Sequence, residues 1–93
     1  IEVKSFYDIL KSLTIKYDFE YADDKLKDLA KKVKDIVEDV ARYPAWNQKY
    51  NIKAGLRADL VILLSDNNYP PIAYDDAYKE IFEQAENFKK NQN

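Results

Sequence analysis

The chain contains no cysteine and no histidine among its 93 residues. Without cysteine it has no disulfide framework and no thiolate nucleophile. Without histidine it has no Ser-His-Asp or Cys-His catalytic arrangement, and without both it has no ordinary zinc site. Its single glycine, Gly55, also excludes a P-loop and a dinucleotide-binding fingerprint, because both motifs need several glycines. The commonest catalytic and cofactor-binding motifs are therefore absent from the sequence.

Long apolar runs and an excess of positive charge are missing as well. The longest apolar run is Leu60–Leu64, far short of the roughly 20 residues that cross a bilayer. The formal net charge of −2 and the pI of about 5.1 argue against general nucleic-acid binding, which needs a basic face. We therefore expect a cytoplasmic protein without membrane contact.

Methionine is absent, and the chain begins with Ile1. Natural full-length proteins are initiated with methionine. We therefore expect the chain to be an excised fragment of a larger protein.

The sequence does contain many apolar residues at helical spacing. Leucine, isoleucine, valine and alanine recur at i, i+3, i+4 and i+7 in four stretches that turn-forming residues separate. Pro44 ends the second stretch, and Pro70 and Pro71 separate the third from the fourth. The helices predicted from these patterns cover residues 3–17, 23–42, 51–66 and 74–90. The sequence thus predicts an all-α fold, a small four-helix domain that residues 1–93 form as one unit.

The predicted helix at 51–66 is the most apolar of the four. Val61 and Ile62 add apolar surface beside the stripe that contains Leu60. We therefore expect this helix to be the most buried one. Gly55 lies inside it or near its first turn, where glycine costs about 1 kcal/mol relative to alanine.

Seventeen acidic residues raise the question of a catalytic or metal-binding pair of carboxylates. Residues that are neighbours in sequence do not face each other on a helix. Asp23 or Asp24, and likewise Asp75 or Asp76, stand where a helix should start, so we interpret them as caps for free backbone N–H groups. No EF-hand spacing is present. We therefore expect no catalytic residue, no metal site and no bound cofactor in this chain.

Eight tyrosines and one tryptophan are a high aromatic content for this length, and several fall in the links between helices. Buried rings there can hold helix ends together, whereas exposed rings can anchor a partner protein. Both interpretations stay open for Trp46. The candidate partner contacts are Tyr43, Trp46, Tyr50 and Tyr69.

Basic residues provide a second set of candidates, for contact with phosphate groups of DNA. Acidic residues interleave with them along the second predicted helix, which favours an ordinary solvated face. The candidates are Lys25, Lys31, Lys32, Arg42 and Arg57.

The order of several short segments carries a resemblance to a known family. The segments are FYDIL (6–10), DDKLKDLAKKVKDIVEDV (23–40), Trp46, IKAGLRADLVILL (52–64), NYPP (68–71) and YKEIFEQAENFKK (78–90). This series resembles the C-terminal helical region of the R (restriction, or motor) subunits of type I restriction-modification enzymes. The sequence departs from the family pattern at Gly55, where a larger residue is more common, and at Asn68, where glycine is common.

The resemblance implies a bacterial or archaeal parent subunit that cleaves DNA with ATP and Mg²⁺ after joining a methyltransferase–specificity core. It also implies that nuclease and ATPase domains precede this region. None of the motifs of those domains can be matched to these residues, so no catalytic residue is carried over. The resemblance further implies that this helical region helps to dock the R subunit onto the core.

Three hypotheses follow for the function of the chain. The leading one is a non-catalytic C-terminal assembly module that docks the R subunit onto the methyltransferase–specificity core or onto the adjacent motor domain. One alternative is a helical DNA-contacting module that supports the motor, which would need the five basic candidates on one acid-free face. The other is an unrelated helical adaptor for protein interactions.

Overall fold

The computed structural model describes residues 2–90, with side chains described for residues 2–88. Residues 1 and 91–93, which the predicted domain 1–93 includes, lie outside the described residues. The α-helices are α1 (Val3–Lys16), α2 (Asp23–Ala41), α3 (Tyr50–Asp66) and α4 (Tyr74–Lys90). The short 3-10 helices η1 (Trp46–Gln48) and η2 (Pro71–Ala73) precede α3 and α4. Because residues 2–90 contain no strand, the predicted all-α fold is confirmed, and each helix boundary lies within one residue of its prediction.

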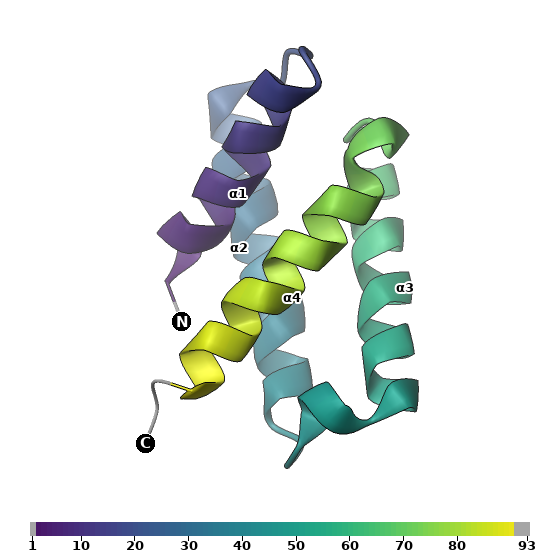
Figure 1. The fold of residues 1–93 in the computed structure, drawn as a ribbon. Coiled ribbons are helices and arrows are strands. Elements are labelled where there is room, and N and C mark those ends of the chain that lie inside the picture. Colours follow the sequence, from purple (N-terminus) through teal and green to yellow (C-terminus); the bar gives the residue numbers. More distant parts are fainter. Residues whose placement is uncertain (1, 91–93) are drawn as a thin grey trace.

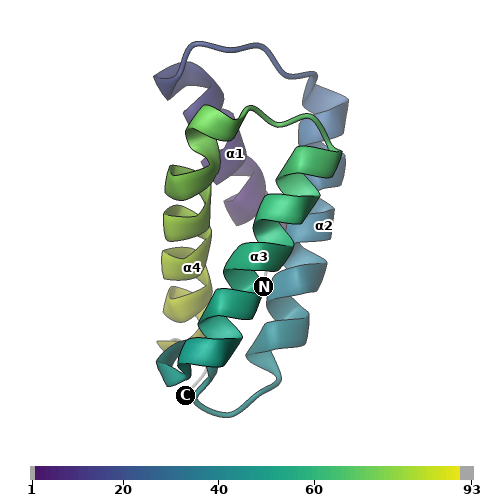
Figure 2. The same ribbon diagram turned by 90° about the vertical axis from the view of Figure 1, so that its right-hand side faces the viewer.

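The four helices run up and down in alternation around one core (Figure 1). Helix α2 packs against both α1 and α3, and α4 closes the arrangement by packing against α3 and α1. Figure 2 shows α3 in front, with α4 and α2 on either side of it and α1 behind. Short links explain this arrangement, because they force consecutive helices to lie antiparallel to each other.

Apolar stripes of all four helices meet in a single hydrophobic cluster. The fully buried members of the predicted stripes are Phe6, Leu10, Leu13, Leu26, Leu29, Ala30, Val33, Val37, Leu56, Leu60, Leu64, Ala77, Ile81 and Ala85. Helical spacing of 3.6 residues per turn brings the members of each stripe to one side of their helix. The periodicity in the sequence therefore identified the inward face of each helix.

Helix α3 is not the most buried helix, so that prediction is wrong. Only Leu56, Leu60 and Leu64 are buried on α3, whereas five residues of α2 are buried. Ile62 keeps 59% of its surface exposed. The physical reason is that α3 lies at the edge of the arrangement, where no described helix covers its outer side. Helix α3 is apolar on more than one side, and its composition did not indicate which of these sides would pack against another helix.

The end of α3 forms a tight turn at Asn68. The backbone of Asn68 is left-handed, with φ of 58°. Its N–H donates to the Ser65 carbonyl at 3.1 Å, and the N–H of Tyr69 donates to the Leu64 carbonyl at 2.9 Å. This is the Schellman arrangement that ends many helices, and asparagine tolerates it better than most residues other than glycine. The turn therefore forms at a position where glycine is common in the resembled family.

The end of α1 repeats this arrangement at Asp18, whose φ is 53°. The N–H of Phe19 donates to the Thr14 carbonyl at 2.9 Å. In each turn an aromatic residue directly follows the left-handed residue: Phe19 follows Asp18, and Tyr69 follows Asn68. The rings of Phe19 and Tyr69 then meet edge to face, with centroids 5.3 Å apart. The two helix ends are thereby joined to each other.

The aspartates at the helix starts lie inside the first turn instead of at the capping position. Ala22 is the N-cap residue of α2, and it makes no side-chain capping bond. Asp23 and Asp24 follow it as the first helical residues, and Asp75 and Asp76 likewise lie within the first turn of α4. The predicted capping role is therefore wrong, although the negative charges still favour the positive end of each helix dipole.

Candidate functional site

The link between α2 and α3 turns a sharp corner that directs Trp46 inward. Ala45 adopts the left-handed backbone region, with φ of 54°, just before η1 begins. Trp46 is only 2% exposed and packs edge to face on Phe82 of α4, with ring centroids 5.4 Å apart. The side chain of Asn47 donates to Glu86 of α4 at 2.9 Å. The corner is therefore fixed to α4 as well as to the helices that it connects.

The structure divides the aromatic candidates into two pairs. Tyr43 and Tyr50 are 56% and 79% exposed, and they precede and follow the corner in the sequence. Trp46 and Tyr69 belong to the hydrophobic core, and Tyr69 is only 1% exposed. Burial favours the packing interpretation for this second pair. Contact of any of the four with a partner protein stays a prediction.

Tyr69 is the centre of a buried aromatic cluster at the opposite end of the molecule. Its hydroxyl donates to the Leu10 carbonyl of α1 at 2.9 Å, and its ring contacts those of Phe19 and Tyr21. The hydroxyl of Tyr21 in turn donates to the Asn67 carbonyl at 2.6 Å. Burial raises the pKa of Tyr69 well above its ordinary value, so the ring stays neutral. The cluster joins the two turns that end α1 and α3.

A groove of about 560 Å³ runs between α3 and α4 on the side of Tyr50. Its apolar walls come from Tyr50 and Ala54 of α3 and from Tyr78 and Phe82 of α4. The rings of Tyr78 and Phe82 lie 5.9 Å apart, and the buried Trp46 supports Phe82 from the core side. The small side chain of Ala54 leaves room between the two helices. The groove is therefore an apolar hollow with a firmly packed floor.

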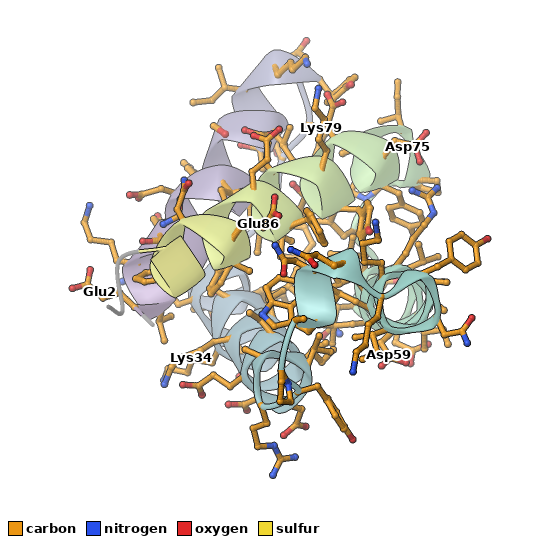
Figure 3. All side chains as sticks on the ribbon, turned by 60° about the horizontal axis from the view of Figure 1, so that its bottom comes forward. Glu2, Lys34, Asp59, Asp75, Lys79 and Glu86 are labelled. Carbon is orange, nitrogen blue, oxygen red and sulfur yellow. The ribbon has the colours of Figure 1, made fainter. Side chains whose placement is uncertain are left out.

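Charged side chains line the rest of this groove. The cations are Lys53, Arg57 and Lys79, and the anions are Glu83 and Glu86. The guanidinium group of Arg57 donates to Asp75 at 2.7 Å and lies 5.4 Å from the ring centre of Tyr78. Figure 3 shows Asp75, Lys79 and Glu86 along α4, while Asp59 extends from α3 on the side away from α4. Cations thus outnumber carboxylates in the groove lining by one.

The five basic candidates do not form one acid-free face. Carboxylates pair with three of them: Lys32 with Asp28 at 3.1 Å, Arg42 with Asp39 at 3.0 Å, and Arg57 with Asp75 at 2.7 Å. Lys25 and Lys31 are exposed on the same helix as Lys32. The positive charge is therefore interrupted by negative charge.

Asp76 and Glu80 border a second hollow, of about 380 Å³, between α1 and α4. Asp76 accepts hydrogen bonds from Lys16 at 2.7 Å and from the Tyr17 hydroxyl at 2.5 Å, which lower its pKa. The pKa of Glu80 is raised, first by burial and then by the neighbouring charge of Asp76. Among residues 2–90, no three histidine, cysteine, aspartate or glutamate side chains are grouped as metal ligation requires. Through its bonds to Lys16 and Tyr17, Asp76 links α4 to the end of α1.

The α3–α4 groove was not predicted from the sequence. In the sequence, Tyr78 and Phe82 stand out only as members of the family segment 78–90, and Ala54 only as a member of the segment 52–64. The spacing of Tyr78 and Phe82 by four residues places them on one helical face. That spacing was a usable signal, but nothing local indicated that Ala54 would lie opposite them.

The fold and the groove define a small all-α domain with an open hollow between two helices. Comparison with known proteins identifies the family to which this domain belongs. The family described as "Type I restriction enzyme HindI endonuclease subunit-like, C-terminal" matches residues 2–91. The chain therefore belongs to this family, and the resemblance noted from its sequence is confirmed. Comparisons with curated proteins and with solved structures gave no match. Family membership leaves no place for the alternative of an unrelated helical adaptor.

No described helix is both long and apolar enough to cross a membrane.

Proposed function

We propose that this domain is a non-catalytic assembly module of a type I restriction endonuclease subunit. It docks that subunit onto the methyltransferase–specificity core or onto the adjacent motor domain. The observation that carries the proposal is the open, aromatic groove between α3 and α4, in a chain of the endonuclease-subunit family. ATP and Mg²⁺, which the parent subunit would use in DNA cleavage, would be bound by other parts of that subunit.

The exposed aromatic rings support this proposal. Tyr43 and Tyr50, before and after the corner, are both exposed, and Tyr50 also lines the groove. Tyrosine is enriched at the energetically important positions of protein interfaces, because it offers a large rigid ring with a polar end. The fixed corner holds both rings on well-packed structure, so little conformational entropy is lost when a partner covers them.

Contact with DNA is the weaker candidate. Binding to phosphate groups releases counterions only where cations face the duplex without competing carboxylates. The ion pairs of Lys32, Arg42 and Arg57 with aspartates oppose such a face. We therefore propose a protein partner for the domain.

The proposal is tested by titrating the purified domain into two preparations. One is the methyltransferase–specificity complex of the same system, and the other is the endonuclease subunit lacking this domain. Binding to either one at tens of micromolar or tighter is the expected result. No detectable binding to both, at the same concentrations, would contradict the assembly role.

A further inference from the structure

The two walls of the α3–α4 groove carry charges of opposite sign. Both charged side chains that α3 contributes to the lining are cations, Lys53 and Arg57. Helix α4 contributes one cation and two carboxylates, namely Lys79, Glu83 and Glu86. Asp75, at the start of α4, pairs with Arg57 at 2.7 Å. With Asp75 counted, three cations balance three carboxylates, so the groove has no net charge, but its α3 wall is positive and its α4 wall is negative.

The two walls are also matched in level along the groove. The guanidinium group of Arg57 lies 5.4 Å from the ring centre of Tyr78 on α4. Lys53 precedes Arg57 by four residues, and α4 runs in the opposite direction to α3 (Figure 1). The residue of α4 at the level of Lys53 therefore follows Tyr78 by four positions. That residue is Phe82, and the carboxylate of Glu83 follows it directly.

An apolar hollow and a projecting ring occur together in this groove. Tyr78 and Phe82 form the floor of the hollow, whose volume is about 560 Å³. Tyr50 lines the same groove but keeps 79% of its surface exposed. Covering such a ring and such a floor gains about 25 cal/mol for each Å² of apolar surface removed from water. One copy of the domain thus offers both a hollow and a ring that could fill a hollow.

We propose that two copies of this domain pair through the groove, each placing Tyr50 in the groove of the other. A two-fold interface brings the same patch of both copies together, so the patch must complement itself. An axis parallel to the groove places the α3 wall of each copy on the α4 wall of the other, at the same level. Lys53 of each copy then faces Glu83 of the other. An axis across the groove would instead oppose α3 to α3 and bring like charges together.

The pairing goes beyond the docking function proposed above and does not depend on it. We expect a weak pair, with a Kd on the order of 100 µM, because a contact centred on one groove stays below the roughly 800 Å² per partner of stable complexes. Pairing covers the groove, so any partner that docks there must first separate the two copies.

A charge exchange between the two walls tests the pairing and its symmetry. Sedimentation equilibrium of the 93-residue chain, at concentrations up to about 1 mM, measures the Kd. Lys53→Glu and Glu83→Lys each bring like charges together across the axis, so either variant alone should raise the Kd at least about tenfold. An equimolar mixture of the two variants should return the Kd to within about threefold of the unaltered value, because every such contact in the mixed pair joins opposite charges. This recovery would also show that both variants fold.

Matched variants separate the groove from the rest of the surface. Lys25→Glu makes the same charge change on α2, at an exposed position outside the groove lining, and should leave the Kd within about twofold. Tyr50→Ala should raise the Kd at least about fivefold. Tyr43→Ala is its control, because Tyr43 is also exposed but does not line the groove, and it should have no effect.

Two results would overturn the pairing. One is a chain that stays monomeric up to about 1 mM, and the other is a mixture of the charge variants that associates no better than either variant alone. Equal effects of Tyr50→Ala and Tyr43→Ala would overturn the placement of the ring in the groove. Docking is measured separately, by titration into the two preparations named above, so its failure is distinguishable from a failure of pairing.

Discussion

At the scale of single residues, Tyr69 shows why the link between α3 and α4 contains a tyrosine before its two prolines. Its ring lies under the turn, between Phe19 and Tyr21, and its hydroxyl reaches across to the backbone of α1. The prolines restrict the chain on the other side, so the turn has few alternative conformations when unfolded. The tyrosine therefore holds α3, α1 and the turn together from the inside.

Replacing this tyrosine should separate the contribution of the ring from that of the hydroxyl. Tyr69→Ala should lower the free energy of unfolding by about 3 kcal/mol or more, because it leaves a cavity in the aromatic cluster. Tyr69→Phe keeps the ring and should cost only about 1 kcal/mol, through the lost bond to the Leu10 carbonyl. Chemical denaturation measures both values. A change within about 0.5 kcal/mol for Tyr69→Ala would mean that the ring is not buried.

Gly55 is a residue of low helix propensity in α3. It lies in the interior of α3, and a β-carbon added there would meet no atom within 4 Å. Gly55→Ala should therefore raise the free energy of unfolding by roughly 0.5–1 kcal/mol, because alanine loses less backbone entropy on folding.

A thermal melt measures this effect as a rise of several degrees in Tm. The comparison variant is Asn51→Ala. It introduces alanine at another exposed position of α3, where the replaced residue is not glycine. A loss of stability in Gly55→Ala would mean that this backbone is not helical, or that another group occupies the space beside it.

At the scale of the helices, Tyr7 within α1 and Tyr17 directly after it attach α1 to the starts of α2 and α4. The hydroxyl of Tyr7 donates to Asp23 in the first turn of α2, and that of Tyr17 donates to Asp76 in the first turn of α4. Each aspartate thus favours the dipole of its own helix and binds α1 at the same time. These bonds explain why acidic residues stand at both positions without capping either helix.

The bonds to Asp76 should make the stability of the domain depend on pH. Because Lys16 and Tyr17 hold the pKa of Asp76 below its ordinary value, the folded state binds its proton more weakly than the unfolded state does. The resulting stabilisation is present above about pH 4 and is lost as the pH falls through the lowered pKa. Asp76→Asn should therefore reduce the loss of stability on acidification.

Denaturation at about pH 7 and about pH 3 measures that loss for each variant. Asp59→Asn, which removes a carboxylate from the exposed middle of α3, is the control. If the loss on acidification is the same in Asp76→Asn as in the unaltered domain, the bonds to Lys16 and Tyr17 do not contribute to stability.

The helices and their inward faces could be predicted from the sequence, whereas the contacts between helices could not. Periodicity is a local property, so the stripe through Leu56, Leu60 and Leu64 was visible in advance. The bond from Tyr17 to Asp76 joins residues 59 positions apart, and no local pattern indicates it. The α3–α4 groove likewise depends on which helices become neighbours and on the small size of Ala54.

At the scale of the whole molecule, the two ends of the helical arrangement differ in what they expose. One end encloses Tyr69 between two half-buried rings, whereas the corner at Trp46 leaves Tyr43 and Tyr50 exposed, and Tyr50 lines the α3–α4 groove. The enclosed end accounts for stability, and we propose that the other end accounts for docking.

Assembly of the full enzyme tests the proposed role of the domain most directly. The measurement is the Kd between the methyltransferase–specificity complex and the endonuclease subunit, with and without the part that corresponds to residues 2–91. We expect removal of this part to raise the Kd at least about 100-fold, since the removed surface contains the proposed anchoring residues. A truncated subunit that binds within about twofold of the intact one would contradict docking onto the methyltransferase–specificity core.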